Sequence, residues 1–338
     1  ITESGAIWHA RSMSQFLLFD RFQNGEDIKP QLQWLVDHGR NMIRIFVVWA
    51  PRAPNPDLAK LPAFFDLCAE YGIRVEASVV TGDNRSVEEW RRTIQTVYDA
   101  ARERWNVIVE AVNEPWNGWA SQLDPQRLMQ GVNRHGVLSA YGYAPQGVPG
   151  TEDFKAGPAL DYVTWHSPRD SHFPHNGKDA LGIRSAYRKP VIDDEPLGYA
   201  NFDRQGGGAR TTNADLMVSH MGTCAVWANG CTWHTESGLG GLVPASGTIE
   251  EAISRRLQAV AAFYPSNAST GRYTRFGLSE YALGWSTGAR TNHAYGSILG
   301  GVQWVVVPYP NPGWTPQPVN GWRIATLGPE LGMLSLTR

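Results

Sequence analysis

The 338-residue sequence has little cysteine, few charged residues and no long apolar run. Charged residues make up 18% of the chain, and the formal net charge of −2 argues against nucleic acid as a partner. No apolar run approaches the roughly 18 to 20 residues that span a bilayer, so we expect no membrane partner. The sequence begins at Ile1 without an initiator methionine, and a secreted or periplasmic location is favoured if a signal peptide was removed.

The cysteines and histidines do not show the ligand spacing of a metal site. No combination of Cys, His and carboxylates resembles a zinc motif, and no glycine-rich phosphate loop follows an expected strand. We therefore expect no metal and no organic cofactor. Cys68 is expected in the core, and the odd number of three cysteines favours free thiols over a Cys224–Cys231 disulfide.

Tryptophan, in contrast, is abundant, with fourteen residues. These large, flat side chains allow two interpretations. They form either a tryptophan-rich core or a set of platforms on which the C–H faces of sugar rings stack. The positions of individual tryptophans must decide between the two.

Segments typical of strands and of helices alternate from the N-terminus to residue 265. Helices are expected at residues 27–39, 86–105, 212–229 and 248–264. Ser86 with Glu89 and Thr248 with Glu251 have the spacing of helix caps. Strands are expected near residues 6–10, 41–49, 73–81, 107–115, 138–146, 161–167, 190–196 and 231–237. This number of strands, most followed by a helix, favours an α/β fold of the (β/α)8 TIM barrel type over an open sheet or two separate domains.

The pattern changes after Pro265, where turns containing Gly, Asn and Pro separate strand-like segments without intervening helices. We therefore divide the chain into a barrel over residues 1–265 and a C-terminal module over residues 266–338. The module is expected to be a small antiparallel β structure packed on the barrel.

Polar and aromatic side chains gather where the expected barrel strands end. The catalytic groups of TIM barrels project from the carboxyl ends of the strands, whereas the opposite face serves stability. The residues at these ends include Asn113, Glu114, Trp165, His166, Glu195 and Trp233. We expect them to meet at one mouth of the barrel, as a sugar-binding site would require.

Glu114 and Glu195 are the central pair of this set. Each closes an apolar strand, and each is followed directly by proline. A glutamate resists burial unless it is paired or chemically active. Two carboxyls at strand ends can divide acid/base and nucleophilic work on a glycosidic bond. The alternative is that both are structural ion-pair partners of Arg44, but two such acids beside His166 favour catalysis.

Five motifs resemble those of a known clan of enzymes. The segment "VEAVNEP" (109–115) resembles the fourth strand of clan A, the retaining (β/α)8 glycoside hydrolases. The segment "KPVIDDEP" (189–196) resembles the seventh strand of glycoside hydrolase family five. "GRNMIRIFVVW" (39–49), "TWHSP" (164–168) and "CTWHT" (231–235) are similar to the second, sixth and eighth strands. The resemblance covers roughly residues 1–265.

The resemblance implies a role for each matching polar residue. Glu114 would be the acid/base, and Glu195 would be the nucleophile. Asn113 would hydrogen-bond the sugar 2-hydroxyl, and His166 would face the substrate. Arg44 would hold Glu195 ionised, because a nearby cation lowers the pKa of a carboxylate.

Four tryptophans are candidates for lining sugar subsites. The resemblance implies that Trp233 is a stacking platform at the end of the eighth strand. Trp49 and Trp116 follow the second and fourth strands and are expected to line further subsites. Trp165, beside His166, is included as a substrate contact.

The seventh-strand segment contains two further acids whose orientation depends on register. With period-two alternation, Asp193 shares the face of Glu195 and Asp194 points the other way; a shift by one residue would reverse this. The family pattern also differs at the third strand, which ends in Thr81-Gly82-Asp83 where many members have a histidine.

The sequence therefore predicts a retaining β-glycoside hydrolase that cleaves a glycan or β-glycoside by double displacement. The two carboxyls are expected about 5 to 5.5 Å apart. The alternative is a non-catalytic carbohydrate-binding barrel that has lost hydrolase activity. A metal-dependent barrel hydrolase fits less well, because no His-x-His pattern is present. The sugar, the linkage and the choice between internal and terminal cleavage stay open.

Overall fold

The computed structural model describes the barrel strands, most of the N-terminal helices and the strands of the C-terminal module. The described residues are 8–49, 52–81, 85–114, 125–143, 161–167, 180, 183, 187–196, 198–199, 210–211, 230–261, 295–299, 302–306, 323–326 and 333–337. The expected helix at 212–229, Trp116 and Cys224 lie outside them.

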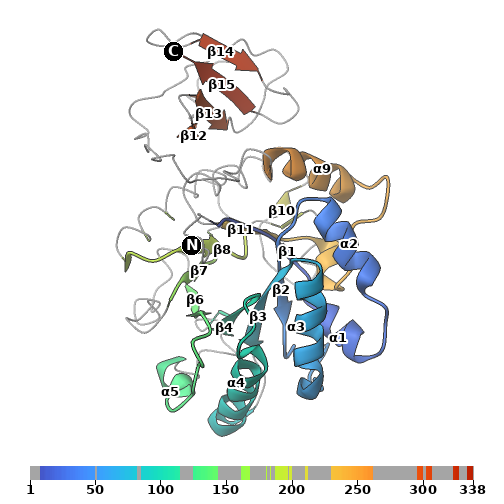
Figure 1. Cartoon of the computed structure of the whole chain (residues 1–338), viewed down its shortest axis with the longest axis vertical. Coiled ribbons are helices and arrows are strands. Elements are labelled where there is room, and N and C mark those ends of the chain that lie inside the picture. The colour runs from blue at the N-terminus through green and yellow to red at the C-terminus, as the bar shows by residue number, and fades with distance from the viewer. Residues whose placement is uncertain are drawn as a thin grey trace.

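Nine strands form one sheet in which every pairing is parallel. In sheet order they are β5 (Ser139–Ala140), β4 (Val107–Val112), β3 (Arg74–Val80), β2 (Met42–Phe46), β1 (Ala10–Ser14), β11 (Gly230–Trp233), β8 (Val191–Asp193), β7 (Val163–Trp165) and β6 (Gly142–Tyr143). β5 and β6 are two parts of one strand position separated by Tyr141, and they pair with β4 and β7 respectively. The sheet therefore has eight strand positions and closes into the predicted (β/α)8 TIM barrel (Figure 1).

The helices at 29–37, 87–101 and 249–261 begin and end close to where the sequence predicts them, whereas the short helix at 236–239 begins inside a segment predicted as a strand. Seven α-helices are described. They are α1 (Leu18–Gln23), α2 (Lys29–Asp37), α3 (Leu61–Glu70) after the 3-10 turn η1 (Leu58–Lys60), α4 (Val87–Ala101), α5 (Pro125–Met129), α8 (Glu236–Leu239) and α9 (Ile249–Ala261). The predicted capping box of α4 is confirmed: the Glu89 amide donates to Ser86 Oγ at 3.2 Å, and the Ser86 amide donates to the Glu89 carboxylate at 2.8 Å. Within the described residues, no helix is both long and apolar enough to cross a membrane.

The two faces of the barrel strands differ in chemistry. Outward-facing residues such as Ile43 and Ile45 pack with Leu35 of α2 and Phe64 of α3 in the main hydrophobic core. Inward-facing residues form a smaller apolar floor, which consists of Ala10, Met42, Ile108, Ala140, Tyr162 and Ile192. Two residues further along the chain from members of this floor lie the buried polar side chains Ser12, Arg44, Glu110, Thr164 and Asp194. The barrel interior is thus apolar at the amino ends of the strands and polar toward their carboxyl ends.

Residues after 265 contribute a separate four-stranded antiparallel sheet. Its order is β12 (Tyr295–Leu299), β13 (Val302–Val306), β15 (Met333–Thr337) and β14 (Arg323–Thr326). A two-stranded parallel sheet, β9 (Gly198–Tyr199) with β10 (Arg210–Thr211), completes the described strands. The antiparallel pairing agrees with the sequence pattern, whereas the domain boundary at residue 265 stays a prediction.

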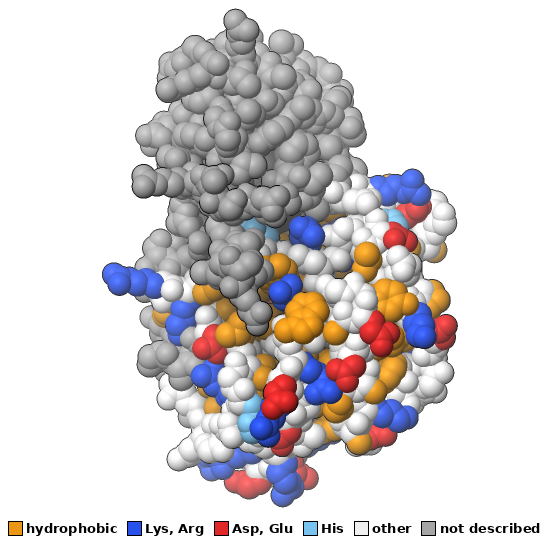
Figure 2. Space-filling view, in the orientation of Figure 1, with side chains coloured by type: hydrophobic (Ala, Val, Ile, Leu, Met, Phe, Trp, Pro, Cys, Tyr) orange, Lys and Arg blue, Asp and Glu red, His pale blue; other side chains and the backbone are white. Residues whose placement is uncertain are grey.

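Acidic and basic side chains are interspersed over the described part of the face seen in Figure 2, and neither sign dominates it. This mixture matches the formal net charge of −2.

Candidate active site

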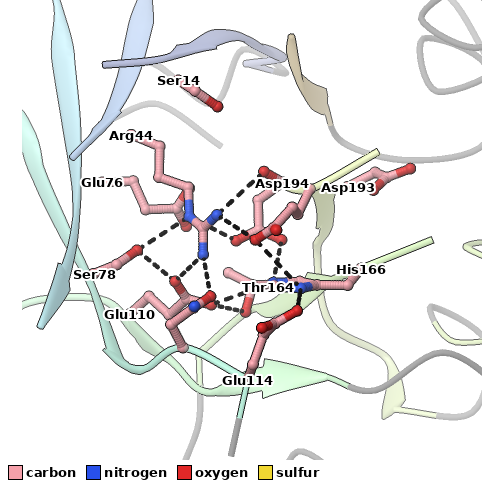
Figure 3. Close-up of polar contacts among 12 residues, drawn as sticks. Ser14, Arg44, Glu76, Ser78, Glu110, Glu114, Thr164, His166, Asp193 and Asp194 are labelled. Carbon is pink, nitrogen blue, oxygen red and sulfur yellow. Dashed lines mark hydrogen bonds and ion pairs between the residues drawn. The ribbon is translucent and has the colours of Figure 1, made fainter. Parts of the chain in front are cut away.

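Arg44 is the centre of a buried polar cluster at the carboxyl end of the barrel (Figure 3). The side chain projects inward from the middle of β2 and is 0% exposed. Its guanidinium donates to Glu195 Oε2 at 3.0 Å, to Glu110 Oε2 at 2.6 Å and to Asn113 Oδ1 at 2.6 Å. Its Nε lies 3.1 Å from Asp194 Oδ2. One cation therefore joins side chains from β2, β4 and the end of β8.

Arg44 carries a permanent positive charge in this setting. Burial alone would lower the pKa of its guanidinium, but the carboxylates of Asp194, Glu110 and Glu195 outweigh that effect and raise the pKa well above its usual value. A charged arginine surrounded by carboxylates favours their ionised forms.

Two of the surrounding acids are fully buried within the strands. Burial raises the pKa of Glu110, although Arg44 opposes the shift, and Glu110 accepts a hydrogen bond from Thr164 Oγ1 at 3.0 Å. Burial and the nearby carboxylates raise the pKa of Glu76 well above its usual value, and Tyr162 donates to it at 2.9 Å. Both environments favour the protonated acid.

Glu114 and Glu195 meet at the mouth of the barrel. Glu114 follows β4 with a φ of 44°, a left-handed conformation that is uncommon for a non-glycine residue and is found preferentially at functional sites. The side chains of Glu114 and Glu195 are 23% and 12% exposed. One carboxylate oxygen of each lies within 4.8 Å of the other. The structure therefore brings together the two acids that the sequence singled out.

His166 lies between these two acids, immediately after β7. Its Nδ1 is 3.3 Å from Glu114 Oε1 and 3.5 Å from Glu195 Oε2, and its Nε2 is 3.3 Å from Asp194 Oδ1. Burial would lower the pKa of the imidazole, but the carboxylates of Asp194 and Glu195 raise it well above its usual value. These carboxylates therefore favour the imidazolium, which has a donor on both nitrogens.

His234 is a site residue that the sequence analysis did not select. It follows β11, is 0% exposed and places Nε2 4.0 Å from Glu195 Oε1. Its Nδ1 lies 2.5 Å from Ser14 Oγ at the end of β1. Glu195 thus has Arg44 and His166 beside one oxygen and His234 4.0 Å from the other.

Trp49 lies in an aromatic group beside the buried cluster. Its ring makes edge contacts with Phe16 and Phe46, at centroid distances of 5.7 and 5.4 Å. The Arg44 guanidinium carbon lies 5.6 Å from the Phe16 centroid and 5.3 Å from that of Phe46. Trp49 is only partly buried, so it keeps its place as a candidate sugar contact.

The predictions that Trp165 and Trp233 contact the substrate are wrong. Both side chains are 0% exposed and belong to the main hydrophobic core outside the barrel. Because successive residues of a strand face opposite sides, the inward positions belong to the next residues, His166 and His234. The eighth strand therefore presents an imidazole, not an indole, to the site.

Of the two registers that the sequence left open, the structure has the one that directs Asp194, and not Asp193, into the site. β8 ends at Asp193, whose Oδ1 accepts a hydrogen bond from the Ser167 amide at 3.4 Å. Asp194 instead contacts Arg44 and His166, as Figure 3 shows, with Asp193 pointing away from them. The alternation stops where the strand ends, so Asp194 and Glu195 both reach the buried cluster.

Two groups of three described side chains have the spacing of cation ligands: Glu110 with His166 and Asp194, and Glu114 with His166 and Glu195. Both groups depend on His166. A metal would require the neutral form of the His166 ring, and Arg44 already supplies positive charge to three of the acids. The donor sets therefore suit proton chemistry better than metal binding.

Comparison with known proteins gives a structural likeness only. No family model matches the sequence, and no curated protein is detectably similar to it. The "putative glycoside hydrolase" from Bacteroides vulgatus superposes with a TM-score of 0.61 at 14% identity, over 88% of this chain and 63% of that one. The chain thus spans less than two thirds of that protein.

Two further solved structures share the barrel. A GH113 β-1,4-mannanase gives a TM-score of 0.51 at 11% identity, over 78% of this chain and 99% of that one. The GH99 endo-α-mannosidase from Bacteroides thetaiotaomicron gives a TM-score of 0.51 at 12% identity, over 72% of this chain and 80% of that one. These similarities establish that the chain has the (β/α)8 fold of these glycoside hydrolases.

Proposed function

We propose that the protein is a retaining β-glycoside hydrolase, with Glu195 as nucleophile and Glu114 as acid/base. The approach of their carboxylate oxygens to within 4.8 Å is the observation that carries the proposal. Retaining enzymes hold the two carboxyls about 5 to 5.5 Å apart, whereas inverting enzymes leave roughly 6.5 to 9.5 Å for a water molecule. The observed gap fits direct attack by one carboxylate.

The different surroundings of the two glutamates support their different roles. Glu195 lies 3.0 Å from Arg44, which favours the ionised carboxylate that a nucleophile requires. Glu114 is the more exposed of the two, at 23% against 12%. It is therefore the better placed of the two to exchange a proton with the leaving group and with water.

The reaction proceeds in two displacements. In the first, Glu195 attacks the anomeric carbon, an ester bond forms, and the glycosidic C–O bond breaks as Glu114 donates its proton to the leaving oxygen. In the second, water attacks the same carbon and passes a proton to Glu114, while the ester bond to Glu195 breaks. Asn113, held by Arg44 at 2.6 Å, is positioned beside Glu114 to contact the sugar 2-hydroxyl.

The structural neighbours support a carbohydrate substrate. Those of comparable fold include a β-1,4-mannanase and an endo-α-mannosidase, so mannans and mannooligosaccharides belong in the first substrate panel beside aryl β-glycosides. The loss of Trp165 and Trp233 as stacking platforms removes part of the case for a purely carbohydrate-binding barrel.

Two variants test the assignment of the glutamates. With an activated aryl β-glycoside, Glu195→Ala should lose turnover about 10³-fold or more and regain it with azide, giving the α-glycosyl azide. Glu114→Ala should keep the first step with a leaving group that needs no proton and should give the β-glycosyl azide. Wild-type protein with azide is the control. Unimpaired hydrolysis by Glu195→Ala would end the proposal, and sugar binding without hydrolysis by wild type would identify a non-catalytic barrel.

A further inference from the structure

We propose that Asp194 is a positioning residue that holds a doubly protonated His166 between Glu114 and Glu195, so that a single cation serves both halves of the reaction. The inference deepens the proposed function and rests on it. Nothing in the double-displacement scheme itself requires Asp194, so its place in the site calls for a separate explanation.

The geometry of His166 carries the first step of the argument. Its Nδ1 is nearly equidistant from the two glutamates, 3.3 Å from Glu114 Oε1 and 3.5 Å from Glu195 Oε2. Its opposite nitrogen, Nε2, faces Asp194 Oδ1 at 3.3 Å (Figure 3). A neutral imidazole has one N–H and could donate to only one side, whereas the imidazolium donates to both. Glu195 on one side and Asp194 on the other therefore suit the charged ring.

The charges around the ring support the same state. The acids that face it are Asp194, Glu195, Glu114 and Glu110, the last with Oε1 3.9 Å from Nε2. Arg44 opposes them as the nearby cation of the same cluster. Asp194 is 0% exposed and makes the largest contribution to raising the pKa of His166. Its charge is not screened by water, so its effect on the ring is strong.

The reaction moves negative charge between the two glutamates. Before attack, Glu195 is ionised and Glu114 carries a proton. In the glycosyl-enzyme, Glu195 is a neutral ester and Glu114 is ionised, so the charge has crossed the gap. A cation 3.3 Å from one acid and 3.5 Å from the other stabilises both arrangements without moving. Preorganised charge of this kind avoids reorganisation during the reaction.

Nuclear magnetic resonance of the histidine ring tests the anchoring directly. Protein labelled with ¹⁵N-histidine would be titrated, and the His166 signals assigned by their loss in His166→Gln. In wild type, both ring nitrogens should stay protonated well above pH 6.5. In Asp194→Asn, which keeps the shape but removes the charge, the ring should titrate at least about one pH unit lower. Asp193→Asn is the matched control, because that adjacent buried acid points away from the ring.

Kinetics give the second readout. Asp194→Asn should move the alkaline limb of the kcat/KM profile to lower pH and reduce kcat about tenfold or more with little change in KM. A structural role for Asp194 would leave the pH profile in place.

Several outcomes would overturn the inference. A neutral His166 in wild type at pH 7 would do so without any variant, which covers the case that Asp194→Asn fails to fold. An unchanged titration in Asp194→Asn, or an equal shift in Asp193→Asn, would also overturn it. If wild type hydrolyses glycosides but His166 titrates identically in wild type and Asp194→Asn, the inference is wrong and the proposed function stands. If wild type hydrolyses no glycoside, the proposed function is wrong and Asp194 has no catalytic role. The titration still shows whether Asp194 holds His166 in the protonated form.

Discussion

Arg44 shows why an arginine, and not a lysine, occupies the centre of the polar cluster. Three nitrogens of one planar group reach three acids: Nη1 to Glu195, Nη2 to Glu110 and Nε to Asp194, at 3.0, 2.6 and 3.1 Å. A lysine ammonium is a single point of charge and cannot meet these three directions at once. A buried charge without a partner is costly. The ion pair between Arg44 and Glu195 is therefore strongly favoured, and it holds the Glu195 carboxylate in place as well as neutralising its charge.

The shifted groups inside the barrel predict that stability falls as pH rises. The folded-state pKa of His166 is raised well above 6.5, and those of Glu76 and Glu110 are raised above 4.5, so the native state binds more protons than the unfolded chain. The His166 contribution is fully present below about pH 6.5 and is lost as pH rises through the folded pKa. Between pH 6 and 9, wild type should lose at least about 1 kcal/mol more than His166→Gln, as measured by urea unfolding.

A surface histidine provides the control for this measurement. His135 pairs with Asp99 at 2.8 Å in a partly solvated position outside the barrel interior, and His135→Gln serves as the control substitution. A wild-type slope equal to that of His166→Gln, or a rise in stability over the same range, would contradict the prediction.

At the scale of single elements, hydrophobic periodicity and cap residues located most strands and helices, although the first strand lies at Ala10–Ser14 and not near 6–10. The predicted strand at 107–115 is β4 at Val107–Val112, and the capping box at Ser86 lies where α4 begins. Strand periodicity and helix caps depend on neighbouring residues, so a single segment of sequence is enough to predict them. The strand at 231–237 is shorter than predicted, because Thr235 caps α8 after only one further residue.

The inner polar layer was harder to predict because its partners are distant in the sequence. Glu110 in "VIVEAV" has no local partner; it is satisfied by Arg44, 66 residues earlier, and Thr164, 54 residues later. The sequence did contain a signal for this position: Glu110 is a polar residue two positions after Ile108, an apolar residue that faces inward. The same spacing relates Met42 to Arg44 and Ile192 to Asp194. Only the closed ring shows that these positions face one another.

The corrected face of β11 leads to a prediction for Trp233. Its indole is 0% exposed in the core, and Arg40 lies 5.3 Å from the ring centroid. Trp233→Ala should therefore lower the free energy of unfolding by about 3–5 kcal/mol, through a cavity and lost burial, and leave the sugar dissociation constant of the folded protein unchanged. Urea unfolding and isothermal titration would measure the two effects.

Trp105 is a matched control, because it is 57% exposed. Trp105→Ala should stay within about 0.5 kcal/mol of wild type. A Trp233→Ala variant of normal stability with weakened sugar binding would return Trp233 to the site.

At the scale of the whole molecule, ring closure brings together residues that are far apart in the chain. β1 pairs with β11 over residues 10–13 and 230–233, and this contact joins the first barrel strand to the last. Site residues between Arg44 and His234 consequently converge at one mouth. The C-terminal strands pair only with one another in the described sheets. Among the described strands, the hydrogen bonds that close the barrel therefore come from residues 10–233.

This arrangement predicts that residues 1–265 fold without the C-terminal module. The described barrel ends with α9 at Ala261, and none of its strand pairings uses a residue after 233. A chain ending at residue 265 should therefore show one cooperative thermal transition within a few degrees of the full chain, and it should keep the glycosidase activity if the site is complete in the barrel. Calorimetry and the same aryl β-glycoside assay provide the measurement, with the full chain as control. Loss of cooperative unfolding would mean that the strands after residue 294 support the barrel, and normal folding without activity would mean that they complete its site.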